Sequence, residues 1–309
     1  VVKGGKTMKL ENAYGRSVKK ATKIKRSFGD WVFTVINGLL MVLLMISVIL
    51  PFWDLVVESL NQGYAAGLNR LWPVRPTLSN YAHVLNNRFI FSGYRETLII
   101  TVCGTLMSVA ATVIGAYSLS KPHFPFRKLF TLMIVIPMFF SGGLIPTYLW
   151  NVQLGLRNTR WVLMLPGLIS SYNLVVMRNF FSGVPLELEE SAYIDGANNI
   201  QIMFRIYMPV SLAVLATVTL WVMVSYWNSW FDATIYITKS DRFPLQVVLR
   251  RIILEGTNEL MDLDSGANVS SMDNIKAATI FICMLPIMCV YPFLQKYFMK
   301  GTLVGAIKG

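Results

Sequence analysis

Long apolar runs separated by short charged stretches dominate the chain. Six of these runs lie between charged residues and have lengths close to the ~20 apolar residues that a helix needs to cross a bilayer. Backbone amides find no water partner in lipid, so each run is predicted to be helical. The predicted spans cover about residues 31–53, 97–120, 129–150, 161–177, 209–231 and 277–295.

The third run differs from the others because it contains helix-breaking residues. Pro137, Gly142, Gly143 and Pro146 all lie inside it. Proline lacks a backbone donor and clashes with the preceding turn, and paired glycines loosen a helix. We therefore expect this span to be kinked or broken, with its irregular part packed against protein.

The composition supports a membrane protein over a large water-soluble domain. Only 14% of the 309 residues are charged, against about 25% in soluble domains. The net charge of +12 does not favour nucleic-acid binding, because the charges punctuate apolar runs and form no basic face. The fold class expected is all-α, a polytopic membrane protein with six transmembrane helices.

The distribution of lysine and arginine predicts the orientation. With six spans both termini lie on the same side, and that side carries 17 Lys and Arg residues against 11 opposite. The basic segment 1–30 contributes most of the excess, and positive charge favours the cytoplasm. We expect residues 1–30 to be a cytoplasmic segment ahead of a transmembrane domain at 31–309, with both termini on the cytoplasmic side.

One polar stretch interrupts the oily sequence on the predicted cytoplasmic side: ELEESAYIDGANNIQIMFRIYMP, residues 187–209. Pro185 suits the first position of a helix, and Asp195-Gly196 is a turn signal. After that turn, apolar residues at steps of three and four predict a second short helix, with Ile200, Met203, Phe204 and Tyr207 on one face. Four acids and a single arginine make this helix–turn–helix a poor match to anionic lipid, and a groove in a protein with a basic rim suits it better.

This stretch resembles the EAA loop of binding-protein-dependent ABC importer permeases. Its pattern begins with Glu190-Ser191-Ala192 and continues with Asp195-Gly196-Ala197. Nine residues separate Gly196 from the last group, Ile206-Tyr207-Met208-Pro209. Ser191 and Met208 stand where the family has alanine and leucine. The tail QKYFMKGTLVGAIKG is similar to the carbohydrate-importer branch. FFSGGLIPTYLW and MRNFFSGVP are similar to permeases for aldouronate-type and other complex oligosaccharides.

The resemblance implies a type I ABC importer permease fold, in which this loop is the coupling helix that docks in a cleft of a cytoplasmic ATPase. Gly196 would supply backbone freedom or close approach, Glu190 would pair with a basic residue of the ATPase, and Phe204 with Tyr207 would form an apolar anchor. The coupling residues implied are Glu190, Ala192, Asp195, Gly196, Ala197, Phe204, Ile206 and Pro209.

The implied partners are a second homologous permease subunit, two ATPase subunits, an extracytoplasmic solute-binding protein and an oligosaccharide. ATP and Mg²⁺ would be used by the ATPases. This chain is expected to be no enzyme and to bind no cofactor itself. GGKT at residues 4–7 lacks the earlier glycine and the flanking strand and helix of a phosphate-binding loop. The acidic outer segment 253–273 is expected to reach toward the binding protein.

Aromatic and amide side chains in the fourth and fifth runs are candidates for a sugar path, since rings stack on sugar faces and amides bind hydroxyls. The alternative is an aromatic belt at the membrane interface, and both interpretations stay open. The candidates are Tyr172, Asn173, Tyr226, Trp227 and Asn228.

No cluster predicts catalysis or a metal site. The three cysteines, Cys103, Cys283 and Cys289, lie in apolar runs without a CxxC pair. No predicted span has a charged residue near its middle, which disfavours an ion-coupled secondary carrier. Three alternatives remain beside the oligosaccharide importer: an importer of another solute, a secondary carrier, and a membrane-embedded enzyme.

Overall fold

A computed structural model describes residues 28–63, 71–255 and 272–306. Within these ranges the regular elements are helices, apart from an isolated bridge between Asn61 and Pro76. The predicted all-helical class is therefore confirmed for the described residues. The chain divides into two compact units, Val1–Phe52 and Trp53–Gly309.

Four described segments are long and apolar enough to cross a membrane. They are α1 (Phe28–Ser59), α3 (Arg88–Ser120), the stretch Leu212–Tyr236 with α11 (Leu212–Trp227) and α12 (Phe231–Tyr236), and the first part of α15 (Met272–Ala306). These segments correspond to the first, second, fifth and sixth predicted spans.

The third predicted span is broken, as its glycines and prolines indicate. It forms α4 (Arg127–Phe139) and α5 (Leu144–Gln153), whose axes differ by 119° across the break. Gly143 precedes α5 with φ of +87°, a conformation that costs glycine little and other residues more. If this bent pair counts as one span, the described residues contain five.

The fourth predicted span, 161–177, is not one helix. It is α6 (Trp161–Met164), an irregular connection, and α7 (Ser171–Ser182). Pro166 and Gly167 lie in that connection, and Ser170 caps α7 by accepting a hydrogen bond from the Asn173 amide. A proline–glycine pair followed by a serine cap stops one helix and starts another, so apolar length alone misplaced these boundaries.

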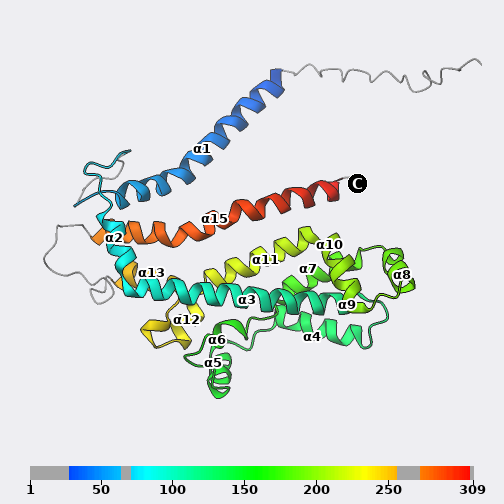
Figure 1. Ribbon diagram of the computed structural model, residues 1–309. Helices are drawn as coiled ribbons and strands as arrows, with labels where there is room; N and C mark the ends of the chain where they lie inside the picture. Colours follow the sequence, from blue (N-terminus) through cyan, green and yellow to red (C-terminus); the bar gives the residue numbers. More distant parts are fainter. Residues whose placement is uncertain (1–27, 64–70, 256–271, 307–309) are drawn as a thin grey trace, which may run out of the picture. The chain divides into compact units, whose positions relative to one another are not determined.

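α3 is the central helix of the second unit. It packs against α7, α11 and α13 (Leu245–Glu255), and Figure 1 shows α11 and α7 lying along it. A Cβ at Gly104 of α3 would lie 2.9 Å from the Tyr226 ring of α11, and one at Gly115 would lie 3.0 Å from the Leu174 side chain of α7. These approaches leave almost no space between α3 and its neighbours.

α3 also begins nine residues earlier than the predicted boundary at residue 97. The charge of Glu96 suggested that boundary, but this side chain is 3% exposed and accepts two hydrogen bonds from Arg160, at 2.6 and 2.8 Å. A bidentate arginine partner makes burial of a carboxylate tolerable. The helix therefore continues past the charge, back to an Asn87 cap that accepts from the Phe89 and Ile90 amides.

Candidate functional site

The polar stretch after α7 folds into two short helical segments joined by a tight turn. The first is α8 (Leu186–Ile194), with Pro185 at its N-cap. Its first turn carries Glu187 and Glu189, where the positive end of the helix dipole favours acids. The predicted first helix is thus present, displaced by one residue. In Figure 1, α8 extends to one side beyond the ends of its neighbours α7 and α9.

Gly196 closes α8 in a left-handed conformation with φ of +78°. Its amide donates to the Tyr193 carbonyl, and the Ala197 amide donates to the Ala192 carbonyl. This pair of bonds is a Schellman motif, which requires a residue such as glycine at its left-handed position. No atom lies within 4 Å of a Cβ built at Gly196. The left-handed conformation agrees with the expected need for backbone freedom at this glycine, and no described part of this chain approaches it closely.

The second segment starts at Asn198, whose side chain and that of Gln201 bond to each other's backbone amides in a capping box. It continues as α9 (Asn199–Ile202), a π-helical turn (Met203–Tyr207) and α10 (Met208–Val210). The predicted second helix is present here, in this less regular form.

The four apolar residues of the predicted face do not share one environment. Met203 and Tyr207 are 6% and 2% exposed, whereas Ile200 and Phe204 are 66% and 56% exposed. Tyr207, expected beside Phe204 as a docking anchor, therefore packs inward. Its ring makes edge contacts with Phe181 and Tyr117, at centroid distances of 5.6 and 5.1 Å.

The remaining candidate residues of the loop also divide by exposure. Ala192, Ala197 and Ile206 are half-buried against the core. Glu190, Asp195, Gly196 and Pro209 are exposed together with Phe204. Ile194, which sequence reasoning passed over, is 86% exposed. The sequence signal for this exposure was the position of the isoleucine, in the last turn of a short helix and directly before the Asp-Gly turn.

A buried polar cluster lies beneath this surface. Lys121 Nζ is 2.6 Å from Glu189 Oε2, and the two side chains are 18% and 9% exposed. The Tyr207 hydroxyl donates to the same carboxylate oxygen at 2.6 Å. The ammonium also lies over the rings of Tyr117 and Tyr207, 4.2 and 4.0 Å from their centroids. We call these four residues the Lys121 cluster.

The protonation of the Lys121 cluster follows from these contacts. Burial opposes ionisation of Glu189, but the bonds from Lys121 and Tyr207 outweigh it and hold the pKa of the carboxyl below its ordinary value. Burial, and then the neighbouring carboxylate, raise the pKa of the Tyr207 phenol, which stays a donor. The cluster therefore holds a carboxylate that keeps its charge at neutral pH.

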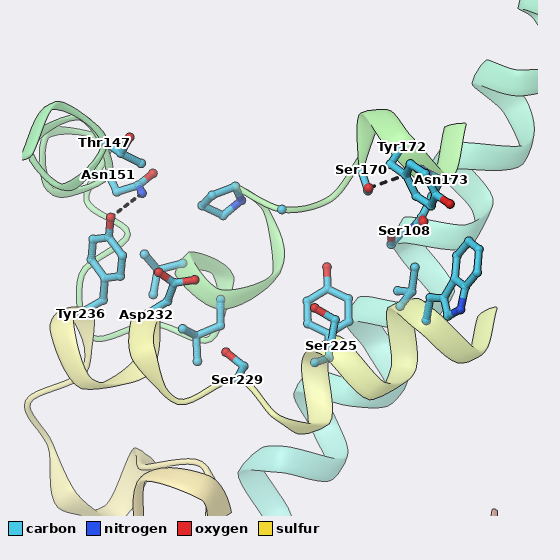
Figure 2. Close-up of a pocket in the computed structure, with 17 residues that line it drawn as sticks. Ser108, Thr147, Asn151, Ser170, Tyr172, Asn173, Ser225, Ser229, Asp232 and Tyr236 are labelled. Carbon is cyan, nitrogen blue, oxygen red and sulfur yellow. Dashed lines mark hydrogen bonds between the residues drawn. The ribbon is translucent and has the colours of Figure 1, made fainter. Parts of the chain in front are cut away.

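A second candidate site is a cavity of about 550 Å³ in the Trp53–Gly309 unit. Its described lining combines apolar residues with aromatic and hydroxyl- or amide-bearing ones, and it has one carboxylate, Asp232, and no lysine, arginine or histidine. Figure 2 shows labelled polar side chains from α3, α5, α7 and α12 around it, including Ser108, Asn151, Asn173 and Asp232.

Three of the five sugar-path candidates line this cavity: Tyr172, Asn173 and Tyr226. Trp227 is a buried core residue against Tyr94, and neither it nor Asn228 is among the lining residues. The cavity also has polar residues that the sequence analysis did not select. Asn151 donates to the Tyr236 hydroxyl at 2.9 Å, drawn as a dashed line in Figure 2. Both residues lie outside the predicted spans 129–150 and 209–231, so the sequence pattern gave no signal for them.

An aromatic pair stands at one side of the cavity. The rings of Tyr172 and Trp221 are 5.6 Å apart and tilted by 39°, and both side chains are at least 40% exposed. Flat, accessible rings beside hydroxyl and amide groups form a surface on which a polyhydroxy compound can stack and hydrogen-bond. No group of three or more metal-ligating side chains occurs in the part of the chain that the structure describes.

The long apolar helices, with the polar loop between α7 and α11, have the architecture of a membrane protein. The family model described as "binding-protein-dependent transport system inner membrane component" matches residues 21–304, and the chain belongs to this family. Similarity to two curated proteins of Bacillus subtilis (strain 168) extends over 90% of the chain. Protein LplC is 40% identical over 95% of its length, and the polygalacturonan/rhamnogalacturonan transport system permease protein YtcP is 35% identical over 96%.

A solved structure agrees with this assignment. A chain of a bacterial ABC transporter that imports the acidic polysaccharide alginate matches with a TM-score of 0.83 and 32% identity, covering 88% of this chain and 99% of that one. A chain in the alginate transporter complexed with its alginate-pentasaccharide-bound periplasmic protein matches at 14% identity with a TM-score of 0.59, which supports the fold alone.

Proposed function

We propose that this chain is a permease subunit of an ATP-driven, binding-protein-dependent importer of oligosaccharides. Family membership supports the permease role, and similarity to permeases of polygalacturonan/rhamnogalacturonan, melibiose/raffinose/stachyose and galactooligosaccharide systems supports the sugar class. Its partners are a second permease subunit, two ATPase subunits that use ATP and Mg²⁺, and an extracytoplasmic solute-binding protein.

The proposed topology has six membrane crossings, a coupling loop on the cytoplasmic side, and both termini there. The bent pair α4–α5 supplies the third crossing and α6 with α7 the fourth. Residues 1–27 and 256–271 lie outside the described residues, so the basic N-terminal segment and most of the acidic loop 253–273 remain part of the proposal. That loop is proposed to face the binding protein.

The single observation that carries the coupling role is the surface of loop 185–209. Ile194, Ile200 and Phe204 expose apolar side chains there, next to the carboxylates of Glu190 and Asp195. Apolar side chains presented by short helices fit a hydrophobic groove, and the adjacent acids favour a basic rim. Such a surface matches a cleft on an ATPase better than it matches an anionic membrane surface.

The cavity is proposed as this subunit's part of the sugar path. Tyr172 and Trp221 offer stacking faces, and Asn173, Ser108 and other polar side chains offer hydrogen bonds. In this proposal, closure of the ATPase dimer moves loop 185–209, and the spanning helices then change the side from which the cavity is open. ATP binding at the ATPase is thereby coupled to the side of the membrane from which sugar can reach the cavity.

The test is co-purification of the ATPase with the assembled importer, combined with sugar uptake into vesicles. Glu190→Lys and Gly196→Trp should abolish both, because the first reverses a docking charge and the second places a bulky side chain at the turn. Glu187→Lys is the matched control, since it reverses an exposed acid on the same helix outside the motif, and it should retain both. Normal ATPase binding and uptake in the first two variants would refute the coupling role.

Orientation has its own test. A cysteine at Ile194, in a chain with Cys103, Cys283 and Cys289 replaced, should react with a membrane-impermeant thiol reagent only after the cells are opened. Reaction in intact cells would place the loop outside and refute the topology and the coupling role together.

A further inference from the structure

The Lys121 cluster connects the exposed loop to the helical core. Lys121 directly follows α3, Glu189 lies in the first turn of α8, and Tyr207 ends the π-helical turn of the second segment. Phe181 of α7 packs on the Tyr207 ring. Three segments therefore meet at one ion pair, with α7 packed behind it, and Glu189 is the buried acid through which α8 contributes to it.

The contacts of this ion pair define a single geometry. The Glu189 carboxylate is approached by an ammonium and a phenol, both at 2.6 Å, and the ammonium is enclosed by two aromatic faces. A charge removed from water is stable only while its partners stay in place, so separating this pair is far costlier than separating a surface pair. The contact therefore behaves as a stiff link between α8 and the end of α3.

Hydrogen bonds form a second link between the loop and the C-terminal end of α3. The Asn199 side chain accepts hydrogen bonds from Tyr193 of α8 and from Tyr117 of α3. Arg127 and Arg178 each donate to the Leu119 carbonyl, at 3.0 and 3.2 Å, and fix the last turn of α3 from two sides. The C-terminal end of α3 is thus tied to both halves of the loop.

α3 is suited to carry a displacement into the core. At Gly104 it lies against the Tyr226 ring of α11 and at Gly115 against the Leu174 side chain of α7, so closely that an added Cβ would crowd either neighbour. A helix packed this closely against two others moves together with them.

We propose that the Lys121–Glu189 ion pair is the joint through which movement of α8 reaches α3, and hence the helices around the cavity. Lys121 and Glu189 are positioning residues in this role, whereas Glu190 on the adjacent exposed position meets the ATPase. The inference rests on the proposed coupling function of loop 185–209. It goes beyond that function by distinguishing the residues that contact the ATPase from the residues that transmit the movement of α8 to α3.

The experiment measures sugar uptake per ATP hydrolysed by the complete importer, with its binding protein, in vesicles. Glu189→Gln and Lys121→Met should still co-purify with the ATPase and hydrolyse ATP, while uptake per ATP falls about tenfold, the size of a typical coupling between sites. Lys121→Arg keeps the charge and should retain most of the uptake. The charge exchange Lys121→Glu with Glu189→Lys should restore part of what either single substitution loses.

A second buried ion pair of α3, Glu96 with Arg160, provides the matched control. Glu96→Gln also removes a buried carboxylate from α3's contacts, so it should lower the temperature of unfolding but leave uptake per ATP unchanged. A purely structural role predicts the same outcome for Glu189→Gln as for Glu96→Gln, and that result overturns the proposal. Failure of every Lys121 and Glu189 variant to assemble, the charge exchange included, also overturns it, because the pair would then serve folding alone.

These outcomes are distinct from failure of the proposed function. If the wild-type chain binds no ATPase, the importer assignment itself is wrong. If wild type binds and transports, Glu190→Lys loses the ATPase, and Glu189→Gln transports with normal uptake per ATP, the coupling function stands and only the joint is refuted.

Discussion

At the scale of single residues, Glu189 and Glu190 are neighbours with opposite environments. Glu189 is 7% exposed and paired with Lys121, while Glu190 is exposed. A helix turns by about 100° per residue, so one step along α8 moves a side chain from the core to the surface. A buried acid and an exposed acid thus stand side by side, and only the exposed one, Glu190, falls in the motif that resembles the family pattern.

Gly196 gives a prediction about backbone conformation. Gly196→Ala should destabilise the protein by about 1 kcal/mol, because a left-handed conformation strains a residue with a Cβ, while the space around the position is open. Gly196→Asn should cost less, since asparagine tolerates this region better. Thermal unfolding in detergent measures both. Equal losses for alanine and asparagine would show that the conformation is not the cause.

Glu189 gives a prediction about pH. Its pKa in the folded protein lies below the ordinary 4.5, so the folded state binds fewer protons on this group than the unfolded state. The stability it contributes is complete above that ordinary value and is lost as pH falls through the lowered pKa. Unfolding temperature measured from neutral pH downward should therefore fall more steeply in wild type than in Glu189→Gln. Parallel curves would contradict this.

At the scale of elements, the second half of the loop is divided between a buried and an exposed side. Its predicted apolar face is present, but only part of that face packs against the core. Met203 and Tyr207 pack against the chain, and Ile200 and Phe204 are left at the surface. An apolar face wider than its own core contact leaves surface for another protein to bury.

The division predicts different effects for two neighbouring substitutions. Phe204→Ala should leave the unfolding temperature close to wild type and weaken ATPase binding about tenfold or more, as expected for an aromatic anchor. Met203→Ala should instead lower stability by about 2–5 kcal/mol, because it leaves a cavity in the core. Calorimetry and a binding titration with purified ATPase separate the two. Loss of stability without loss of affinity in Phe204→Ala would contradict the division.

At the scale of the whole molecule, the cavity is assembled from distant segments. Ser108 of α3, Asn151 of α5, Asn173 of α7, Trp221 of α11 and Asp232 of α12 all line it. The described lining carries one carboxylate and no cationic side chain. If this cavity is the sugar path proposed above, its carboxylate should repel uronates more than uncharged sugar units, since like charges repel most strongly where water is scarce.

Asp232 therefore predicts a charge preference. Asp232→Asn should raise uptake of acidic oligosaccharides relative to neutral ones by about fivefold, the equivalent of ~1 kcal/mol of charge repulsion at moderate screening. Competition between a galacturonate and a galactose oligosaccharide of equal length, in vesicles with the complete importer, measures the ratio. Thr147→Val changes another lining residue without changing charge and should leave the ratio as it is. An unchanged ratio in Asp232→Asn would refute the preference.

Much of the architecture follows from the order of residues along the chain. The helical class, the break in the third apolar run, the turn at Asp195-Gly196 and the two halves of the loop were all predicted. The helix at 161–177 was wrong, because Pro166, Gly167 and the Ser170 cap interrupt it. The start of α3 was also misplaced, because the charge of Glu96 was counted without its partner Arg160. Tyr207 was expected on the surface and lies in the core.

The sequence by itself determined where helices form, where they stop and which stretch resembles a coupling loop, because hydrophobic length, glycine, proline and caps act over a few neighbouring residues. Tertiary structure alone decided which acid of Glu189 and Glu190 is buried, and which polar residues reach the cavity. Those outcomes depend on contacts between residues far apart, such as Lys121 with Glu189 and Asn151 with Tyr236. Local pattern carries no information about a partner that only the folded chain brings within reach.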